Sequence, residues 1–210
     1  MIKRQMIVGL LGVILVYGGV EAKWQPGNIL GAISDPGELK SEQTDLGINV
    51  AHAQTYLKQN RSFLGTDDIN LLQKAINDAN TVINENFVNT NVTEVRNAAN
   101  SLEQARSNAE NNLGLFRAVK RNDRDSLKGA RQFLDNKANS NAKDTNGNTP
   151  LFFVKDGSMA ALLLSYGADV NATNNAGQTP LDVAVMAKNS NVVTFLKSNG
   201  ATPGAGTATK

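Results

Sequence analysis

The residue types that carry most protein chemistry are scarce in this chain. It has no cysteine and a single histidine, His52. Thiol nucleophiles, disulfides and thiolate metal sites are therefore excluded, and a histidine-rich metal or acid–base site is impossible. The sequence also shows no Ser/His/Asp set with a nucleophile elbow and no phosphate-binding glycine loop. We expect no enzymatic activity, no cofactor, no metal and no disulfide partner.

Basic side chains recur at short spacing in one segment. The formal net charge is only +2, so overall electrostatics do not favour a nucleic-acid partner. In one continuous helix the spacing would place these side chains on a single face, where they could bind an acidic partner or an anionic wall polymer. Asp123 and Asp125 interrupt the run, and the alternative is a solvated polar face. The six residues are Arg117, Lys120, Arg121, Arg124, Lys128 and Arg131.

Residues 1–22 have the organisation of a signal peptide. A positive pair, KR, precedes an apolar stretch at residues 6 to 17, and the sequence VEA offers a cleavage site after Ala22. The alternative is a membrane anchor at residues 6–20, although a spanning helix needs roughly 20 apolar residues. We therefore expect an exported protein that is periplasmic, extracellular or envelope-associated.

After residue 22 the chain is predicted to form a linker and then three helices. Residues 23–37 are punctuated by proline and glycine and are predicted to be a linker. Between residues 38 and 112, apolar residues recur with the period of three amphipathic helices joined by short connections, which favours a small antiparallel helical bundle. The expected core positions are Leu46, Val50, Ala53 and Leu57, then Ile69, Leu72, Ile76, Ala79 and Ile83 with Leu71, Ala75 and Val82 at their side, then Val95, Ala98, Leu102, Ala105 and Ala109.

Two stretches of this predicted bundle share a recognisable cadence. LLQKAINDANTVI is an Ala-rich helix, and TEVRNAANSLEQA follows it as a Thr-x-Val helix that ends in Leu-x-x-Ala. In this respect residues 44–112 weakly resemble the FIVAR modules of exported bacterial surface proteins. The resemblance implies glycan binding or spacing along a surface, and it assigns no glycan-contacting residue. An unrelated helical bundle is the alternative.

A second pattern occupies the C-terminal part of the chain. The sequences GNTPL and GQTPL each place a threonine where it can cap a helix, Thr149 and Thr179, before a proline suited to the first helical position. Aligned on these helix starts, Leu115, Leu151 and Leu181 are 36 and 30 residues apart. Their mean of about 33 is the ankyrin period.

Together with LLLSYGADVNA and FLKSNGA, this spacing makes residues 113–202 resemble ankyrin repeats. The resemblance implies a solenoid of about three repeats, and hence an all-α chain in which a small bundle precedes the repeats. It also implies that the chain binds other proteins.

The chain departs from the family pattern at several positions. The usual histidine after Thr-Pro-Leu is replaced by Phe152 and Asp182, and Lys137 stands where a helix-ending glycine is expected. The middle unit is three residues short before Ala160, which predicts a truncated inner helix or a tightened loop. The small polar tail, residues 203–210, is predicted to be disordered.

Under the family resemblance, a partner protein would contact the tips of the extended finger loops and adjacent positions on the inner helices. For each such residue alone, the alternative is a solvated turn position. The predicted binding residues are Thr145, Asn146, Asn148, Lys155, Asn175, Ala176 and Gln178. Phe152, Phe153 and Phe195 are expected to pack in the core.

The predicted function is therefore an exported, non-catalytic protein–protein interaction module. The alternative is a cell-surface glycan-binding or spacer protein that acts through its bundle. The expected partner is another protein or, under the alternative, a cell-wall glycan.

Overall fold

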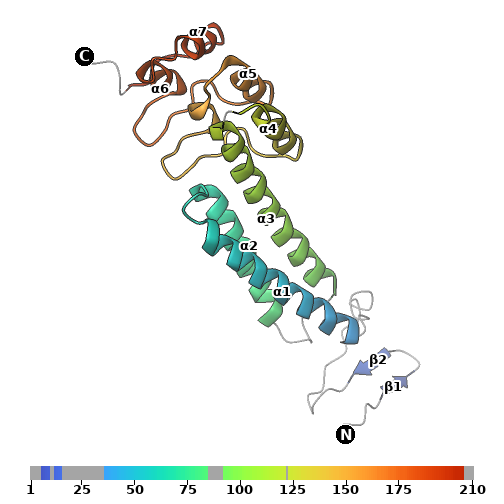
Figure 1. Cartoon of the computed structure of the whole chain (residues 1–210). Coiled ribbons are helices and arrows are strands. Elements are labelled where there is room, and N and C mark those ends of the chain that lie inside the picture. The colour runs from blue at the N-terminus through green and yellow to red at the C-terminus, as the bar shows by residue number, and fades with distance from the viewer. Residues whose placement is uncertain (1–5, 10–11, 16–35, 85–91, 122, 206–210) are drawn as a thin grey trace.

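In the computed structural model, the helices form an elongated molecule with a bundle at one end and stacked helix pairs at the other (Figure 1). The structure describes residues 6–9, 12–15, 36–84, 92–121 and 123–205. The predicted all-α fold class, a bundle followed by a short solenoid, is confirmed. The elements are β1 (Met6–Gly9), β2 (Gly12–Leu15), α1 (Pro36–Asn60), α2 (Thr66–Asn84), α3 (Val92–Arg121), α4 (Ser126–Asp135), the 3-10 helix η1 (Pro150–Phe153), α5 (Gly157–Ser165), α6 (Pro180–Met186) and α7 (Ser190–Ser198).

The predicted signal peptide contains a short hairpin. β1 and β2 pair antiparallel with Met6 opposite Leu15 and Gly9 opposite Gly12. Across the residues that the structure describes, no helix has the length and apolar character needed to cross a membrane. The proposed cleavage site after Ala22 and most of the predicted linker lie outside the described residues, and the signal peptide stays a prediction.

The bundle consists of α1, α2 and the N-terminal part of α3, as the apolar periodicity predicted. Leu46, Ala53, Leu72, Val95 and Leu102 are each almost completely buried in its core. The prediction that Leu71 lies in the core was wrong. Its side chain is 58% exposed, because α1 and α3 cover the stripe of α2 that carries its neighbour Leu72. Half-buried residues line the margins of this core: Ile69, Val82, Ile83, Ala98 and Ala105.

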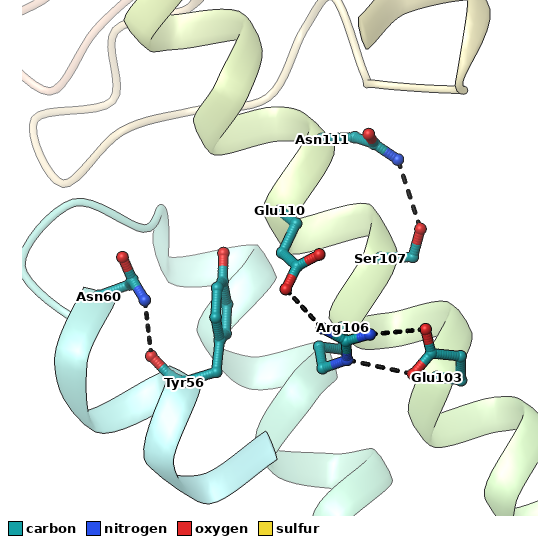
Figure 2. A network of polar contacts seen from close by, with 7 residues as sticks. All are labelled: Tyr56, Asn60, Glu103, Arg106, Ser107, Glu110 and Asn111. Carbon is teal, nitrogen blue, oxygen red and sulfur yellow. Dashed lines mark hydrogen bonds and ion pairs between the residues drawn. The ribbon is translucent and has the colours of Figure 1, made fainter. Parts of the chain in front are cut away.

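A polar cluster lies on α3 where it faces α1 (Figure 2). Arg106 forms ion pairs with Glu103 at 2.7 Å and with Glu110 at 2.5 Å, three and four residues away on the same helix. Tyr56 of α1 stands beside this cluster, and its buried hydroxyl has no hydrogen-bond partner among the residues that the structure describes. Burial, reinforced by the charge of Glu110, raises the pKa of Tyr56 to about 12.

Helix α3 belongs to both parts of the molecule. It runs without a break from Val92 to Arg121, so the predicted boundary between residues 112 and 113 lies inside a helix. Its C-terminal part packs against α4 to form the first helix pair. Gly114 makes this crossing possible, because a Cβ atom there would overlap the ring of Phe133. The bundle and the first helix pair are therefore joined by a shared rigid element.

The outer helices of the three pairs, α4, α5 and α7, end in the same left-handed turn. Gly167 and Gly200 have φ of 81° and 86°, and Lys137 adopts φ of 70° at the equivalent place. In each turn the left-handed residue donates its N–H to the carbonyl three residues earlier in the chain. The residue after it donates its N–H to the carbonyl five residues before itself. The structure thus confirms that Lys137 occupies a glycine position.

The middle pair has a truncated first helix, as the shortened sequence predicted. η1 is a single 3-10 turn, whereas α6 at the same place in the third pair is α-helical. Thr179 caps α6 in a reciprocal capping box with Asp182. The predicted cap by Thr149 was wrong, because in the 3-10 turn the Phe152 N–H bonds to the Thr149 carbonyl instead. Within the described part of the chain, the buried Thr149 hydroxyl has no hydrogen-bond partner.

The chain beyond α7 remains packed for several residues. Gly204 is buried and donates its N–H to Asp182 Oδ2 at 2.9 Å. The predicted disorder of residues 203–210 is therefore wrong for 203–205, because this segment satisfies a buried carboxylate. Residues 206–210 lie outside the described part of the chain.

Candidate protein-binding surface

Two loops of the same construction project beside the stacked helices, and we call them the first finger (residues 143–148) and the second finger (residues 173–178). In the first, Asp144 Oδ1 accepts hydrogen bonds from the N–H groups two and four residues later, both at 2.9 Å. Asn174 Oδ1 does the same in the second finger, at 3.0 Å. Gly147 and Gly177 close the loops with φ of 77° and 72°. Each finger is therefore shaped by its own residues.

Asp144 and Asn174, which shape the loops, are not among the residues predicted from the sequence. The signal was present: each stands three residues before the loop glycine and five before the Thr-Pro pair, in DTNGNTP and NNAGQTP. An Asp or Asn side chain that bonds the backbone ahead of it is a standard device of tight turns.

The fingers also bond to each other. The Asn175 N–H donates to the Asn146 carbonyl at 3.0 Å, and Asn175 Nδ2 donates to the Thr145 carbonyl at 3.3 Å. Asn174 Nδ2 donates to Asn148 Oδ1 at 2.9 Å. Four predicted binding residues, Thr145, Asn146, Asn148 and Asn175, therefore join the two fingers, while the side chains at the tips stay exposed.

A groove of about 570 Å³ lies between the fingers and the inner elements η1 and α6, and we call it the finger groove. Its lining brings together five of the seven predicted binding residues with three apolar side chains. The lining residues are Asn146, Asn148, Phe152, Phe153, Asn174, Asn175, Ala176, Gln178 and Val183. Phe152 and Phe153 pack as predicted, one buried and one half-buried, and they also form part of the groove.

Two predictions about basic residues were wrong. Lys155 lies beyond the end of η1 rather than on an inner helix, and its Nζ donates to the Lys120 carbonyl at 3.2 Å. The six basic residues from Arg117 to Arg131 do not share one helix face, because α3 ends at Arg121 and α4 begins at Ser126. All six are exposed.

One of these cations nevertheless contacts a residue that lines the groove. Lys120 Nζ lies 4.0 Å above the ring centroid of Phe153, and 5.5 Å from that of Phe116. Such cation–π contacts are favourable, and the ammonium group can still bind an anionic partner. Lys120 therefore places positive charge at the edge of the finger groove.

A ladder of asparagines holds neighbouring repeats together behind the fingers. Asn141 donates to the Gly167 carbonyl and accepts from the Asp169 N–H, both at 2.7 Å. Asn171 makes the same pair of bonds one repeat later, to Gly200 and Thr202. These bonds fix the distance between repeats, and hence between the fingers.

The stacking of helix pairs with projecting loops defines a helical repeat protein. The family model described as ankyrin repeats, in three copies, matches residues 115–206. This match supports the resemblance to ankyrin repeats that was predicted for residues 113–202. No match to the chain was found among curated proteins. Ankyrin repeats are protein–protein interaction modules and generally serve as non-catalytic scaffolds. We call the C-terminal part of α3 with α4 the first repeat, η1 with α5 the second, and α6 with α7 the third.

Proposed function

We propose that the chain binds a segment of another protein in the finger groove, with the fingers and the inner elements of the second and third repeats as the contact surface. The observation that carries the proposal is the pair of mutually bonded fingers held over an apolar floor. Phe153 and Val183 lie on that floor, both half-buried. Exposed amide side chains such as Asn146 and Asn175 surround it.

This arrangement suits protein binding for a physical reason. Loops that are already ordered lose little conformational entropy when a partner binds, so more of the contact energy appears as affinity. Side-chain amides can bond both the N–H and the C=O groups of an extended partner backbone. Apolar side chains of the partner can bury against the floor, which supplies the favourable free energy.

Photo-crosslinking tests the proposal directly. A photoreactive phenylalanine analogue would replace Ala176, an exposed tip residue of the second finger, and in a matched control Thr194, an exposed residue of α7. We expect a discrete crosslinked protein from the Ala176 position and not from the Thr194 position. Val183→Glu should abolish the crosslink, because it places a charge on the apolar floor. Equal crosslinking from both positions, or crosslinking unaffected by Val183→Glu, would contradict the proposal.

Export of the chain belongs to the same proposal and is supported by its N-terminal sequence. The alternative of glycan binding through the bundle stays a prediction, and one experiment separates the two. The full chain would be bound to isolated cell envelope that has been treated with protease or, separately, with a wall-glycan hydrolase. Loss of binding after protease alone supports a protein ligand, and loss after glycan digestion alone supports the bundle.

A further inference from the structure

The side chains that adjoin the finger groove differ in chemistry from one end to the other, which bears on the kind of segment it binds under the proposed function. Because stacked repeats are equivalent units, we expect the residue two positions after each aligned leucine on the same face of the solenoid. In the order of the repeats, these residues are Arg117, Phe153 and Val183. The second and third line the groove. These equivalent positions change from cationic to aromatic to aliphatic from the first repeat to the third.

The first-repeat end of this face carries further positive charge. Lys120 lies above the Phe153 ring, and Lys155 reaches the Lys120 carbonyl. Among the described residues, no carboxylate forms an ion pair with Arg117, Lys120 or Lys155. Three carboxylates near these cations in sequence already have partners: Glu110 pairs with Arg106, Asp123 pairs with Arg121, and Asp156 accepts the Met159 N–H as the cap of α5. In the first finger, the Asp144 carboxylate accepts hydrogen bonds from its own loop.

The third-repeat end is apolar and open. Met186, one turn after Val183 on α6, is 67% exposed. Gln178 Nε2 donates to the Met186 sulfur at 3.4 Å, which places this thioether beside the rim of the groove. An exposed methionine next to a groove is an adaptable apolar contact, because its unbranched side chain fits partners of different shape.

We propose that the occupant of the finger groove is a protein segment in which acidic side chains are followed by apolar ones. The acidic side chains lie over Arg117 and Lys120, and the apolar side chains pack between Phe153, Val183 and Met186. The rim amides bond the backbone of the segment and set no sequence preference of their own. This inference rests on the proposed function and adds to it both the chemistry of the partner and its direction along the solenoid.

The inference can be tested with random peptides displayed on phage and selected on the full chain. A length of about ten residues suffices, because an extended chain advances roughly 3.3 Å per residue and repeats stack at the 8–10 Å spacing of packed helices. We expect the selected peptides to carry Asp or Glu at one end and apolar residues at the other. Their affinity should fall as the salt concentration rises, because exposed charges are screened.

Paired charge reversals show whether the cations of the groove are responsible. Arg117→Glu/Lys120→Glu should weaken binding of the selected peptides by about tenfold or more, because two attractions become two repulsions. Lys128→Glu/Arg131→Glu reverses the same number of exposed charges on α4 and should leave the affinity within about twofold. Circular dichroism would show that both variants keep the helical fold.

The outcomes separate this inference from the proposed function. Peptides without acidic residues whose binding is lost in Val183→Glu would overturn the inference and leave the proposed function standing. Failure to select any peptide, or selected peptides that bind Val183→Glu unchanged, would count against both. The full chain would also be tested against an anionic polysaccharide such as polygalacturonate. If this polysaccharide binds, and its binding depends on Arg117 and Lys120 but not on Val183, the inference is overturned, because the two cations would then bind a glycan.

Discussion

The junction between the bundle and the repeats depends on one buried amide, and its removal should be costly. Asn112 of α3 donates from Nδ2 to Asp68 Oδ1 of α2 at 2.8 Å and accepts from the Asn139 N–H at 2.7 Å. Asn112 is 5% exposed and Asp68 is 9% exposed. A hydrogen bond to a charged group contributes about 1.5–3 kcal/mol and a neutral one about 0.5–1.5 kcal/mol. We therefore expect Asn112→Ala to lower the free energy of unfolding by about 2–4 kcal/mol.

Urea unfolding followed by circular dichroism measures this loss, and the neighbouring asparagine supplies the control. Asn111 is half-buried and donates only neutral hydrogen bonds, to the Asn136 carbonyl at 3.0 Å and to Ser107 Oγ at 3.4 Å, so Asn111→Ala should cost less than Asn112→Ala, about 1 kcal/mol. In a double-mutant cycle, Asp68→Ala and Asn112→Ala should show a coupling energy of at least about 1 kcal/mol. The reasoning would be refuted if Asn111→Ala and Asn112→Ala lowered the free energy of unfolding equally and Asn112 showed no coupling to Asp68.

Three further predictions concern single residues. Lys137→Gly should raise the free energy of unfolding by about 0.5–1 kcal/mol. A left-handed conformation costs an L-residue about 1–2 kcal/mol, and the greater conformational freedom of glycine in the unfolded chain offsets part of the gain from removing that strain. Urea unfolding checks this, and Lys137→Ala, which removes the charge and keeps the strain, should show no such gain. Tyr56→Phe should not destabilise the chain at neutral pH, because the buried hydroxyl has no hydrogen-bond partner in the described ranges. Because the pKa of Tyr56 is raised from 10.0 to about 12, the wild type should lose stability as the pH rises above 10, where the unfolded chain ionises first. The Tyr56→Phe variant should lose less unfolding free energy than the wild type over this pH range. Equal losses for the two proteins in urea titrations at alkaline pH would contradict this. Finally, N-terminal sequencing of the chain from an exporting host should begin at Lys23, and a chain beginning at Met1 would contradict a cleaved signal.

The repeats could be predicted from the sequence because their signals are local. A proline at a helix start and a left-handed glycine at a helix end each act within one turn, so Pro180 and Gly167 mark their elements without tertiary information. The truncated inner helix was visible for a similar reason. The shortened unit leaves too few residues for a full helix before Asp156, which caps α5 through its own side chain.

The junction between the bundle and the repeats could not be predicted, because it depends on contacts between distant residues. In isolation Gly114 is a helix-breaking signal, and the contact with Phe133 that makes a glycine necessary there is a tertiary one. The partner of Asn112 is 44 residues away in sequence. The chemistry of the groove was missed in part for the same reason, since Lys120 meets Phe153 only once the second repeat is stacked on α3.

Two sets of contacts indicate how the open ends of the solenoid are closed. At the N-terminal end the bundle takes the place of a preceding repeat. Asn112 bonds the Asn139 N–H as Asn141 bonds the Asp169 N–H one repeat later. Gly65, in the loop between α1 and α2, packs so closely on the Lys143 carbonyl of the first finger that a side chain there would overlap it.

At the C-terminal end, a short backbone segment continues the same pattern. Thr202 bonds Asn171 as Asp169 bonds Asn141 one repeat earlier, and Gly204 bonds the buried Asp182, so residues 202–204 pack against the third repeat. The cationic end of the finger groove is therefore braced by a folded bundle that shares α3 with the first repeat. The apolar end is braced by a few residues of backbone, and Met186 lies exposed beside it. A partner segment would thus be aligned by the rigid cationic end, and the apolar end is the part of the groove best able to adjust to its side chains.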